Sequence, residues 1–174
     1  MQSFFYLRKA FDSVPHRSLL EKLQSSGIDC YILKWLFSYL HNREQYVVLN
    51  EKRSPPNRVT SGVPQGSVLG PLLFLIYIND SAGEMLSTGS SITMYADDLL
   101  LHRVISSSDD YEFLQNDINT LTKWVDRNHL TLNAGKCKCM VIPRPRRRSI
   151  PFYPLKLHMQ TMERVSQYKY LGDQ

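Results

Sequence analysis

The chain has 174 residues, 43% of them hydrophobic and 21% charged, and its formal net charge at pH 7 is +5. This length and composition are enough for one domain with its own core, and they exclude a largely disordered chain. The positive net charge favours a polyanionic partner such as nucleic acid, although many unrelated proteins are also basic.

The first part of the chain predicts a strand and two helices. The aromatic-rich run Ser3 to Leu7 is typical of a buried strand, and Arg8 to Asp12 leads from it into a loop. Leucines at helical spacing predict a helix from Pro15 to Ser26, and Asp29 can cap a second helix that ends near His41. The second helix has an apolar face that we expect in the core. This face consists of Ile32, Trp35, Leu36, Tyr39 and Leu40.

A β-hairpin is expected next. Gln45 to Leu49 and Asn57 to Thr60 are typical of strands, and the polar stretch Asn50 to Pro56 between them contains prolines that favour a turn. Basic side chains around this turn could contact phosphates or could simply be solvated. They are Arg43, Lys52, Arg53 and Arg58.

A longer motif runs from Gly62 to Asp80. Its glycines and proline keep the chain out of a helix and let backbone approach a ligand closely, and an apolar helix begins near Gly70. Because this helix is apolar on most sides, we expect it to be buried. Its expected core residues are Leu72, Leu73, Leu75, Ile76 and Ile78. The apolar run Val68 to Ile78 is about half of the ~20 residues that a membrane span needs, so we expect an intracellular protein without membrane contact.

Two adjacent carboxylates lie in a second predicted hairpin. After a polar loop from Ser81 to Ser90, the runs Ile92 to Ala96 and Leu99 to Leu101 predict two strands with Asp97 and Asp98 at the tip. Neighbouring carboxylates repel each other and are costly to bury. The pair is therefore either a solvated turn or a ligand for a divalent cation, for which Mg²⁺ is the natural candidate.

A long amphipathic helix follows this hairpin. Ser108, Asp109 and Asp110 can cap its start, and acidic residues in the first turn suit the positive end of the helix dipole. The residues of its packing face repeat at helical spacing: Leu114, Ile118, Leu121 and Val125. We interpret Asp109, Asp110 and Asp117 as structural or solvated rather than catalytic.

The C-terminal part predicts strands and a basic loop. Leu130 to Ile142 is typical of a turn that leads into a strand, and residues 143–150 form a proline-broken basic loop that could contact phosphates or be solvated. Leu155 to Met159 and Val165 to Tyr170 alternate as the two strands of a hairpin. The cysteines do not form the CxxC pairs of a zinc site, so we expect packed or free thiols in a reducing compartment. They are Cys30, Cys137 and Cys139.

Two of these motifs together resemble a known family. The stretch from Gly62 to Asp80, followed by Tyr95 to Asp98, is similar to the palm of a reverse transcriptase. Its detailed sequence is similar to that of non-LTR (LINE-type) retrotransposons. The resemblance runs from Lys9 to Gly172, and Tyr170 to Gly172 resembles the primer-grip turn of the family. It implies an α+β fold in which an antiparallel sheet packs on helices, with partial fingers and no thumb. It also implies a single palm domain over residues 1–174, truncated at both ends.

The resemblance further implies a reaction and its components. The family is an RNA-directed DNA polymerase, in which carboxylates of the first and third palm motifs hold two Mg²⁺ ions, with Mn²⁺ as a substitute. The reaction transfers a nucleotide to a primer 3′-hydroxyl. The implied partners are an RNA template, a DNA primer and dNTPs, together with the fingers, thumb or endonuclease segments of a full-length element. The expected location is cytoplasmic or nuclear.

Individual residues take roles from the motifs that they match. Asp97 and Asp98 would be catalytic and would bind the metal, and Lys136, in a motif similar to the fourth palm motif, would neutralise or protonate the leaving pyrophosphate. Gln65 would contact the incoming nucleotide, and Phe11 would pack under its sugar unless it is simply a core residue. The expected nucleotide-binding residues are Lys9, Phe11, Gln65, Gly66 and Tyr95.

One position departs from the family pattern. The first palm motif has a leading Asp six places before its trailing Asp, and this chain has Tyr6 in the leading place and Asp12 in the trailing one. Six residues of extended chain move a side chain by about 20 Å, so Asp12 cannot readily substitute. A phenol with a pKa of about 10 is a poor Mg²⁺ ligand at neutral pH. The sequence therefore predicts a polymerase that is inactive or impaired; the alternative is a non-catalytic nucleic-acid-binding remnant.

Overall fold

The chain folds into two compact units. The computed structural model describes residues 1–79, 86–143 and 150–168. The first unit, the sheet unit, comprises Met1–Arg8 and Ser81–Gln174, and the second, the helical unit, comprises Lys9–Asp80. One domain over residues 1–174 stays a prediction. The helices of the described ranges are all too short or too polar to cross a membrane.

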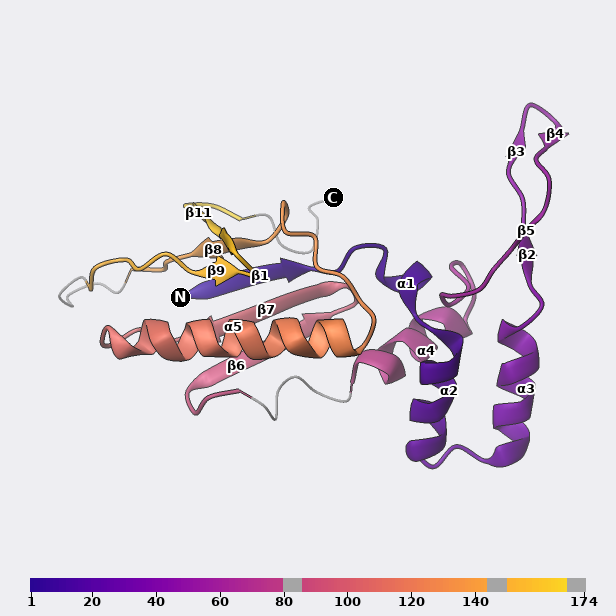
Figure 1. Cartoon of the computed structure of the whole chain (residues 1–174), viewed down its shortest axis with the longest axis horizontal. Helices are drawn as coiled ribbons and strands as arrows, with labels where there is room; N and C mark the ends of the chain where they lie inside the picture. The colour runs from indigo at the N-terminus through magenta and orange to yellow at the C-terminus, as the bar shows by residue number, and fades with distance from the viewer. Residues whose placement is uncertain (80–85, 144–149, 169–174) are drawn as a thin grey trace. The chain divides into compact units, whose positions relative to one another are not determined.

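The sheet unit is built on a five-stranded sheet in the order β11-β8-β1-β7-β6 (Figure 1). The strands are β1 (Gln2–Tyr6), β6 (Ser90–Tyr95), β7 (Asp98–Arg103), β8 (Lys138–Met140) and β11 (Glu163–Val165). Strand β1 lies at the centre and pairs antiparallel with β7 and β8, whereas β11 runs parallel to β8. The sheet is therefore mixed, and not purely antiparallel as predicted. The predicted burial of the first strand is confirmed, because Phe4 and Phe5 are buried.

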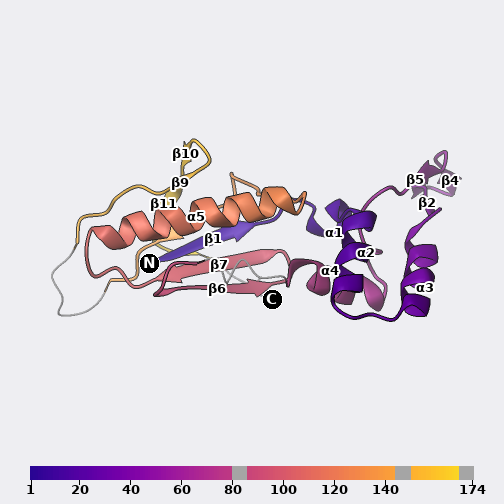
Figure 2. The ribbon, with the colours of Figure 1, turned by 60° about the horizontal axis from the view of Figure 1, so that its bottom comes forward.

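Helix α5 (Asp109–Arg127) covers one face of this sheet (Figure 2). Its predicted packing face is confirmed, since Leu114, Ile118, Leu121 and Val125 are all buried. Alternate residues of β7 are buried as well, including Leu99 and Leu101. The residues between them project to the opposite face of the sheet, which is less covered.

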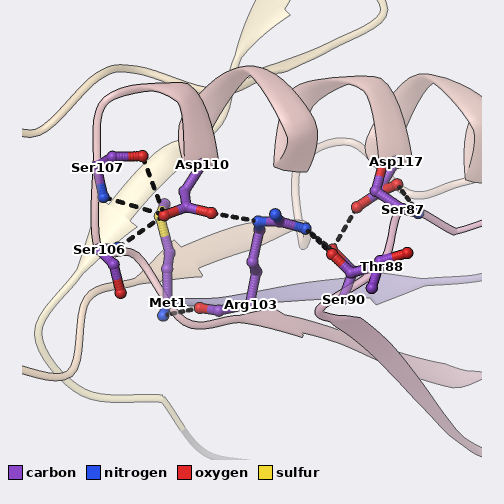
Figure 3. A network of polar contacts seen from close by, with 9 residues as sticks. All are labelled: Met1, Ser87, Thr88, Ser90, Arg103, Ser106, Ser107, Asp110 and Asp117. Carbon is purple, nitrogen blue, oxygen red and sulfur yellow. Dashed lines mark hydrogen bonds and ion pairs between the residues drawn. The ribbon is translucent and has the colours of Figure 1, made fainter.

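A buried ionic network joins the sheet to α5 (Figure 3). The Arg103 side chain is 8% exposed; its Nε lies 3.0 Å from Asp110 Oδ1, and its Nη1 donates to the Thr88 carbonyl and the Ser90 hydroxyl. The Ser90 hydroxyl in turn donates to the carboxylate of Asp117, which is buried. The structural roles expected for Asp110 and Asp117 are therefore confirmed.

The start of α5 is stabilised differently from the prediction. Ser108 occupies the N-cap position, but its side chain makes no capping hydrogen bond. The Asp110 carboxylate instead accepts hydrogen bonds from the backbone N–H groups of Ser106 and Ser107. These bonds, opposed by partial burial and supported by Arg103, lower the pKa of Asp110 below its ordinary value.

The hairpin predicted near the C-terminus is wrong. Strand β9 (Lys156–Leu157) pairs antiparallel with β10 (Gln160–Thr161), and β11 joins the main sheet instead. The reason is a two-residue reversal at His158, whose φ of 52° turns the chain several residues earlier than expected. Residues 144–149 of the predicted basic loop, and the turn of residues 170–172, lie outside the described residues. Cys137 and Cys139 are buried free thiols, and Cys30 is an exposed one.

The helical unit contains four helices within the described residues. They are α1 (Ala10–Ser13), α2 (His16–Ser25), α3 (Cys30–Leu40) and α4 (Leu69–Ile78). Helices α2 and α3 lie side by side, as Figure 1 shows, and the predicted cap of α3 is confirmed because Asp29 Oδ1 accepts the Tyr31 N–H at 2.8 Å. The stretch Arg8 to Asp12 is not simply a loop, since α1 begins at Ala10 after Lys9 adopts a φ of 47°.

Part of the predicted core of this unit is exposed. On α3 only Leu36 and Leu40 of the expected face are fully buried, while Ile32 and Trp35 are more than half exposed. On α4, Leu73 and Ile78 are buried but Leu72 and Leu75 are about half exposed. Apolar periodicity shows which side of a helix could be buried, but it does not show how much of that side another element covers.

The hairpin after α3 is longer and more interrupted than predicted. Strand β2 (Glu44–Gln45) pairs with β5 (Asn57–Arg58), and β3 (Val48–Leu49) pairs with β4 (Lys52–Arg53). Asn50 and Glu51 both have positive φ, which is the conformation of a two-residue turn whose twist matches that of paired strands. The predicted turn therefore contracts to these two residues.

Candidate active site

Asp97 and Asp98 lie at the β6–β7 hairpin, but only Asp97 is in the turn. The turn residues are Ala96 and Asp97, and Asp98 is the first residue of β7, where it pairs with Tyr95. Ala96 has a φ of 52°, a conformation that costs a non-glycine residue about 1–2 kcal/mol. The turn is fixed to the neighbouring strand because the Asp97 carbonyl accepts the Leu7 N–H at 3.0 Å.

The register of the sheet aligns three side chains across neighbouring strands. Asp98 pairs with Tyr95 on one side and with Tyr6, on β1, on the other. Residues directly opposite each other in antiparallel strands project to the same face, with Cβ atoms about 4.5–5.5 Å apart. Tyr95, Asp98 and Tyr6 therefore form a row on the face opposite α5. The residue in the place of the missing family carboxylate thus lies beside Asp98.

The pKa of Asp98 reflects its partial burial and its charged neighbours. Partial burial, and then the charge of Asp97, raise the pKa of Asp98, while the charge of Lys136 acts in the opposite direction. Lys136 Nζ lies 5.8 Å from the centroid of the Tyr6 ring. Its turn is attached to β1, because the Asn133 N–H donates to the Tyr6 carbonyl at 2.7 Å and Lys136 N–H donates to the Asn133 carbonyl. The structure therefore places Lys136 beside Tyr6 and near Asp98, and its role toward the leaving pyrophosphate stays a prediction.

Tyr168 is a further aromatic residue on this face, and no motif of the sequence predicted a place for it at the site. Its ring stacks on Phe4 with centroids 3.6 Å apart, and it lies 6.3 Å from the Tyr6 ring. Burial, and then the neighbouring Tyr6, raise the pKa of Tyr168 above its ordinary value. Its phenol therefore stays neutral at physiological pH and supplies no anionic ligand. The alternation of Val165 to Tyr170 was the only sequence signal for its burial.

The donor set fits a divalent cation only in part. Two adjacent carboxylates, one of which has its pKa raised by burial and then by the charge of the other, are groups that a cation would stabilise. Within the described ranges, however, no group of three or more His, Cys, Asp or Glu residues is placed to hold a metal ion. The side chain opposite Asp98 is the phenol of Tyr6, which at neutral pH is a poor ligand for Mg²⁺.

The helical unit contains the predicted nucleotide-binding residues Gln65 and Gly66. Gln65 is exposed, and its Nε2 donates to Asp12 Oδ1 at 2.8 Å. Gly62 starts the motif with a φ of 88°, and a Cβ at this position would lie 2.7 Å from the Asp12 Cα. Gly66 also has a positive φ, of 75°, but a Cβ there would meet nothing within 4 Å. The motif is thus packed against α1 at Gly62 and open at Gly66.

Phe11 and Lys9 lie beside this motif in the same unit. The Phe11 ring stacks on Phe74 with centroids 4.3 Å apart, and the Phe11 carbonyl accepts the Val63 N–H at 2.7 Å. Phe11 is only partly buried, so both of its predicted roles stay open. Lys9 is exposed, and its carbonyl accepts hydrogen bonds from Asp12 N–H and the Ser13 hydroxyl. The contact of Gln65 with Asp12 had no sequence signal, because 53 residues separate the two.

Comparison with known proteins decides the family. Residues 1–174 match the pattern of the family described as "Reverse transcriptase (RNA-dependent DNA polymerase)". The chain belongs to the reverse transcriptase family. The resemblance to non-LTR retrotransposon polymerases is also confirmed by relatives that match over most of the chain.

The relatives of this reverse transcriptase domain come from insect mobile elements. It is 29% identical over 176 residues to the RNA-directed DNA polymerase from mobile element jockey of Drosophila funebris. It is 32% identical over 179 residues to the probable RNA-directed DNA polymerase from transposon BS of Drosophila melanogaster. Each alignment covers 97% of this chain and 19% of the relative, so the domain spans about a fifth of the length of these relatives.

A solved structure supports the fold of the reverse transcriptase domain. The apo telomerase of Candida tropicalis, truncated from its C-terminal domain, is similar with a TM-score of 0.58. The match has 14% sequence identity and covers 78% of this chain and 29% of the telomerase chain. At this identity the likeness concerns the α+β fold alone.

Proposed function

We propose that this domain is the palm of an RNA-directed DNA polymerase from a non-LTR retrotransposon, and that Tyr6 impairs its catalysis. The observation that carries the proposal is the register of β1 and β7, in which Tyr6 is directly opposite Asp98. In this proposal Asp97 and Asp98 hold the metal, with Mg²⁺ or Mn²⁺ as the ion. Bound there, the ion would lower the pKa of the primer 3′-hydroxyl and stabilise the charge that develops on the phosphate.

The chain's own residues would then prepare the reaction. Lys136 would place its ammonium group near the charge that develops on the leaving pyrophosphate. The Gln65 side chain would exchange its hydrogen bond with Asp12 for one to the incoming nucleotide, and the open space beside Gly66 would admit that nucleotide close to the backbone. Phe11 would pack under the sugar. Lys9 and Tyr95, both exposed, would contribute further nucleotide contacts.

The size of the proposed impairment follows from the missing ligand. Removal of one group aimed at transition-state charge commonly costs about 3 kcal/mol, which is roughly a hundredfold in rate. Loss of a metal ligand should raise the activation free energy by at least the same amount. We therefore propose that the unmodified chain extends a primer at least a hundredfold more slowly than a variant with the third carboxylate.

The proposal includes the partners and the setting. An RNA template, a DNA primer and dNTPs would be the substrates, and fingers, thumb or endonuclease segments would be supplied by a longer element. The domain covers only part of its relatives, which is consistent with such additional segments. The activity would be intracellular, in the cytoplasm or the nucleus.

A non-catalytic nucleic-acid-binding remnant is the second candidate, and Tyr6 itself favours it. Primer extension on an RNA template, with the unmodified chain and Tyr6→Asp side by side, separates the two candidates. Extension that requires Tyr6→Asp supports an impaired polymerase, and its loss in Tyr6→Asp/Asp98→Asn assigns it to this site. Absence of extension in both chains, with RNA binding retained, would instead support the remnant.

A further inference from the structure

Backbone hydrogen bonds fasten the start of the loop of residues 62–66 to the segment around α1. Gly62 N–H donates to the Val14 carbonyl and Val63 N–H donates to the Phe11 carbonyl, each at 2.7 Å. Both of these bonds use N–H groups of the loop. The carbonyl groups of the loop therefore need donors from elsewhere.

The donor to the Gly62 carbonyl is the side chain of His16, the first residue of α2. Nε2 of His16 lies 2.8 Å from the Gly62 carbonyl oxygen, and this hydrogen bond is buried. Because a carbonyl oxygen can only accept, the Nε2 atom must carry the proton. The His16 side chain is 7% exposed, so water does not readily take its place if the bond is lost. The bond therefore holds the loop at a point that solvent cannot hold.

The imidazole of His16 also contacts the chain directly after α3. The His41 ring lies 5.6 Å from the His16 ring between centroids, and it stacks on Phe37 at 3.8 Å. Burial lowers the pKa of His16, the bond to Gly62 raises it, and the charges of His41 and Arg43 lower it. The ring is thus held between the loop and the end of α3, which limits its freedom to turn away from Gly62.

The side chain of Gln65 lies three residues after this anchor. Its Nε2 donates to Asp12 Oδ1 at 2.8 Å, and the Ser61 hydroxyl donates to the Asp12 carbonyl at 2.8 Å. The loop is therefore tied to α1 on both sides of Gly62 by contacts at the surface, and at Gly62 by the buried bond from His16. The buried bond is the one that is costly to break.

We propose that His16 is a positioning residue for the nucleotide loop, in which its Nε2–H holds the Gly62 carbonyl and so keeps Gln65 where the incoming nucleotide meets it. This role rests on the proposed function, in which Gln65 contacts the nucleotide. His16 touches no reacting atom and acts only through the loop. When a loop is ordered in only a fraction of the molecules, the apparent affinity of its ligand falls by that fraction. The anchor at Gly62 therefore increases nucleotide affinity.

Two substitutions separate the hydrogen bond from the ring. His16→Phe keeps a ring but removes the donor, whereas His16→Gln loses the ring but keeps an N–H at about the distance of Nε2 from the backbone. In His16→Phe, hydrogen exchange at the Gly62 and Val63 amides should be about 5- to 150-fold faster, as expected for a buried carbonyl without its donor. The affinity for dTTP with Mg²⁺, followed by NMR at the Gly66 amide, should fall by up to the same factor. His16→Gln should restore most of both losses.

Leu23→Val is the matched control for a general loss of stability. Leu23 lies on the same helix as His16 and is 1% exposed, so the shorter side chain should lower the urea midpoint. Its side chain donates no hydrogen bond to the loop. The exchange rates of Gly62 and Val63 and the affinity for dTTP should therefore stay as in the unmodified chain.

The tautomer of His16 tests the bond without any substitution. In the unmodified chain, ¹⁵N NMR of the imidazole should show the proton on Nε2, and a proton on Nδ1 alone would overturn the proposal. This measurement stands even if His16→Phe does not fold.

The affinities show which proposal fails. If the unmodified chain binds dTTP and His16→Phe binds it equally well, or if His16→Gln is as weak as His16→Phe, the positioning role is overturned and the proposed function stands. If the unmodified chain does not bind dTTP, or Gln65→Ala binds it unchanged, the nucleotide role of the loop fails in the proposed function itself, and the positioning role fails with it.

Discussion

The substitution Tyr6→Asp should make the stability of the domain depend on divalent metal. It places a third carboxylate directly opposite Asp98, at the about 5 Å separation of a cross-strand pair. With an effective dielectric constant of about 20–40 for a partly exposed pair, two such charges repel by about 2–3 kcal/mol. For a chain of this length the midpoint of thermal unfolding should fall by about 4–12 °C in EDTA. Mg²⁺ at a hundred times its dissociation constant should restore about 2.7 kcal/mol.

Thermal unfolding followed by circular dichroism, with and without Mg²⁺, measures this effect. Tyr6→Asn is the matched control, because it removes the same ring and adds no charge. The reasoning is refuted if Tyr6→Asp and Tyr6→Asn unfold at the same temperature in EDTA, or if Mg²⁺ raises both midpoints equally.

Three further predictions concern single groups. Since the pKa of Asp110 is lowered in the folded state, its contribution to stability should be lost as the pH falls below about 4. In urea unfolding, the free energy of unfolding of Asp110→Asn should therefore fall less over this acid range than that of the unmodified chain. Gly62→Ala should lower the free energy of unfolding by about 2–4 kcal/mol, because its φ is positive and the added Cβ overpacks against Asp12. Gly66→Ala should lower it by about 1 kcal/mol, because only the positive φ acts there. Equal losses for the two variants in urea unfolding would contradict this. Asp97→Asn should lower the pKa of Asp98, measured by carboxyl NMR titration, and an unchanged pKa would show that burial alone raises it.

Helices, turns and caps that depend on residues close together in the sequence could be located from the sequence. The packing face of α5 was correct because a repeated apolar spacing over nineteen residues leaves one side to bury. The acidic hairpin was located because two apolar, strand-like runs flank a turn, although Asp98 proved to be a strand residue. The cap of α3 by Asp29 followed from capping chemistry in the same way. The early hairpin was located, but its turn is Asn50 and Glu51 rather than the predicted Asn50 to Pro56.

Features set by distant residues could not be predicted. Burial of Trp35 failed as a prediction because periodicity does not say whether a covering element exists. The network around Arg103 joins residues from three separate stretches, and no local signal pairs them. The motif comparison identified Tyr6 as the departure, but only the register of β1 with β7 shows that its side chain is the neighbour of Asp98.

The rate of single-nucleotide incorporation on an RNA-templated primer tests the central claim most directly. With Mg²⁺ and saturating template and primer, Tyr6→Asp should incorporate at least about a hundred times faster than the unmodified chain, while both bind the substrate equally well. Equal rates in the two chains, whether both are fast or both undetectable, would contradict the claim that the phenol at this position is what limits the enzyme.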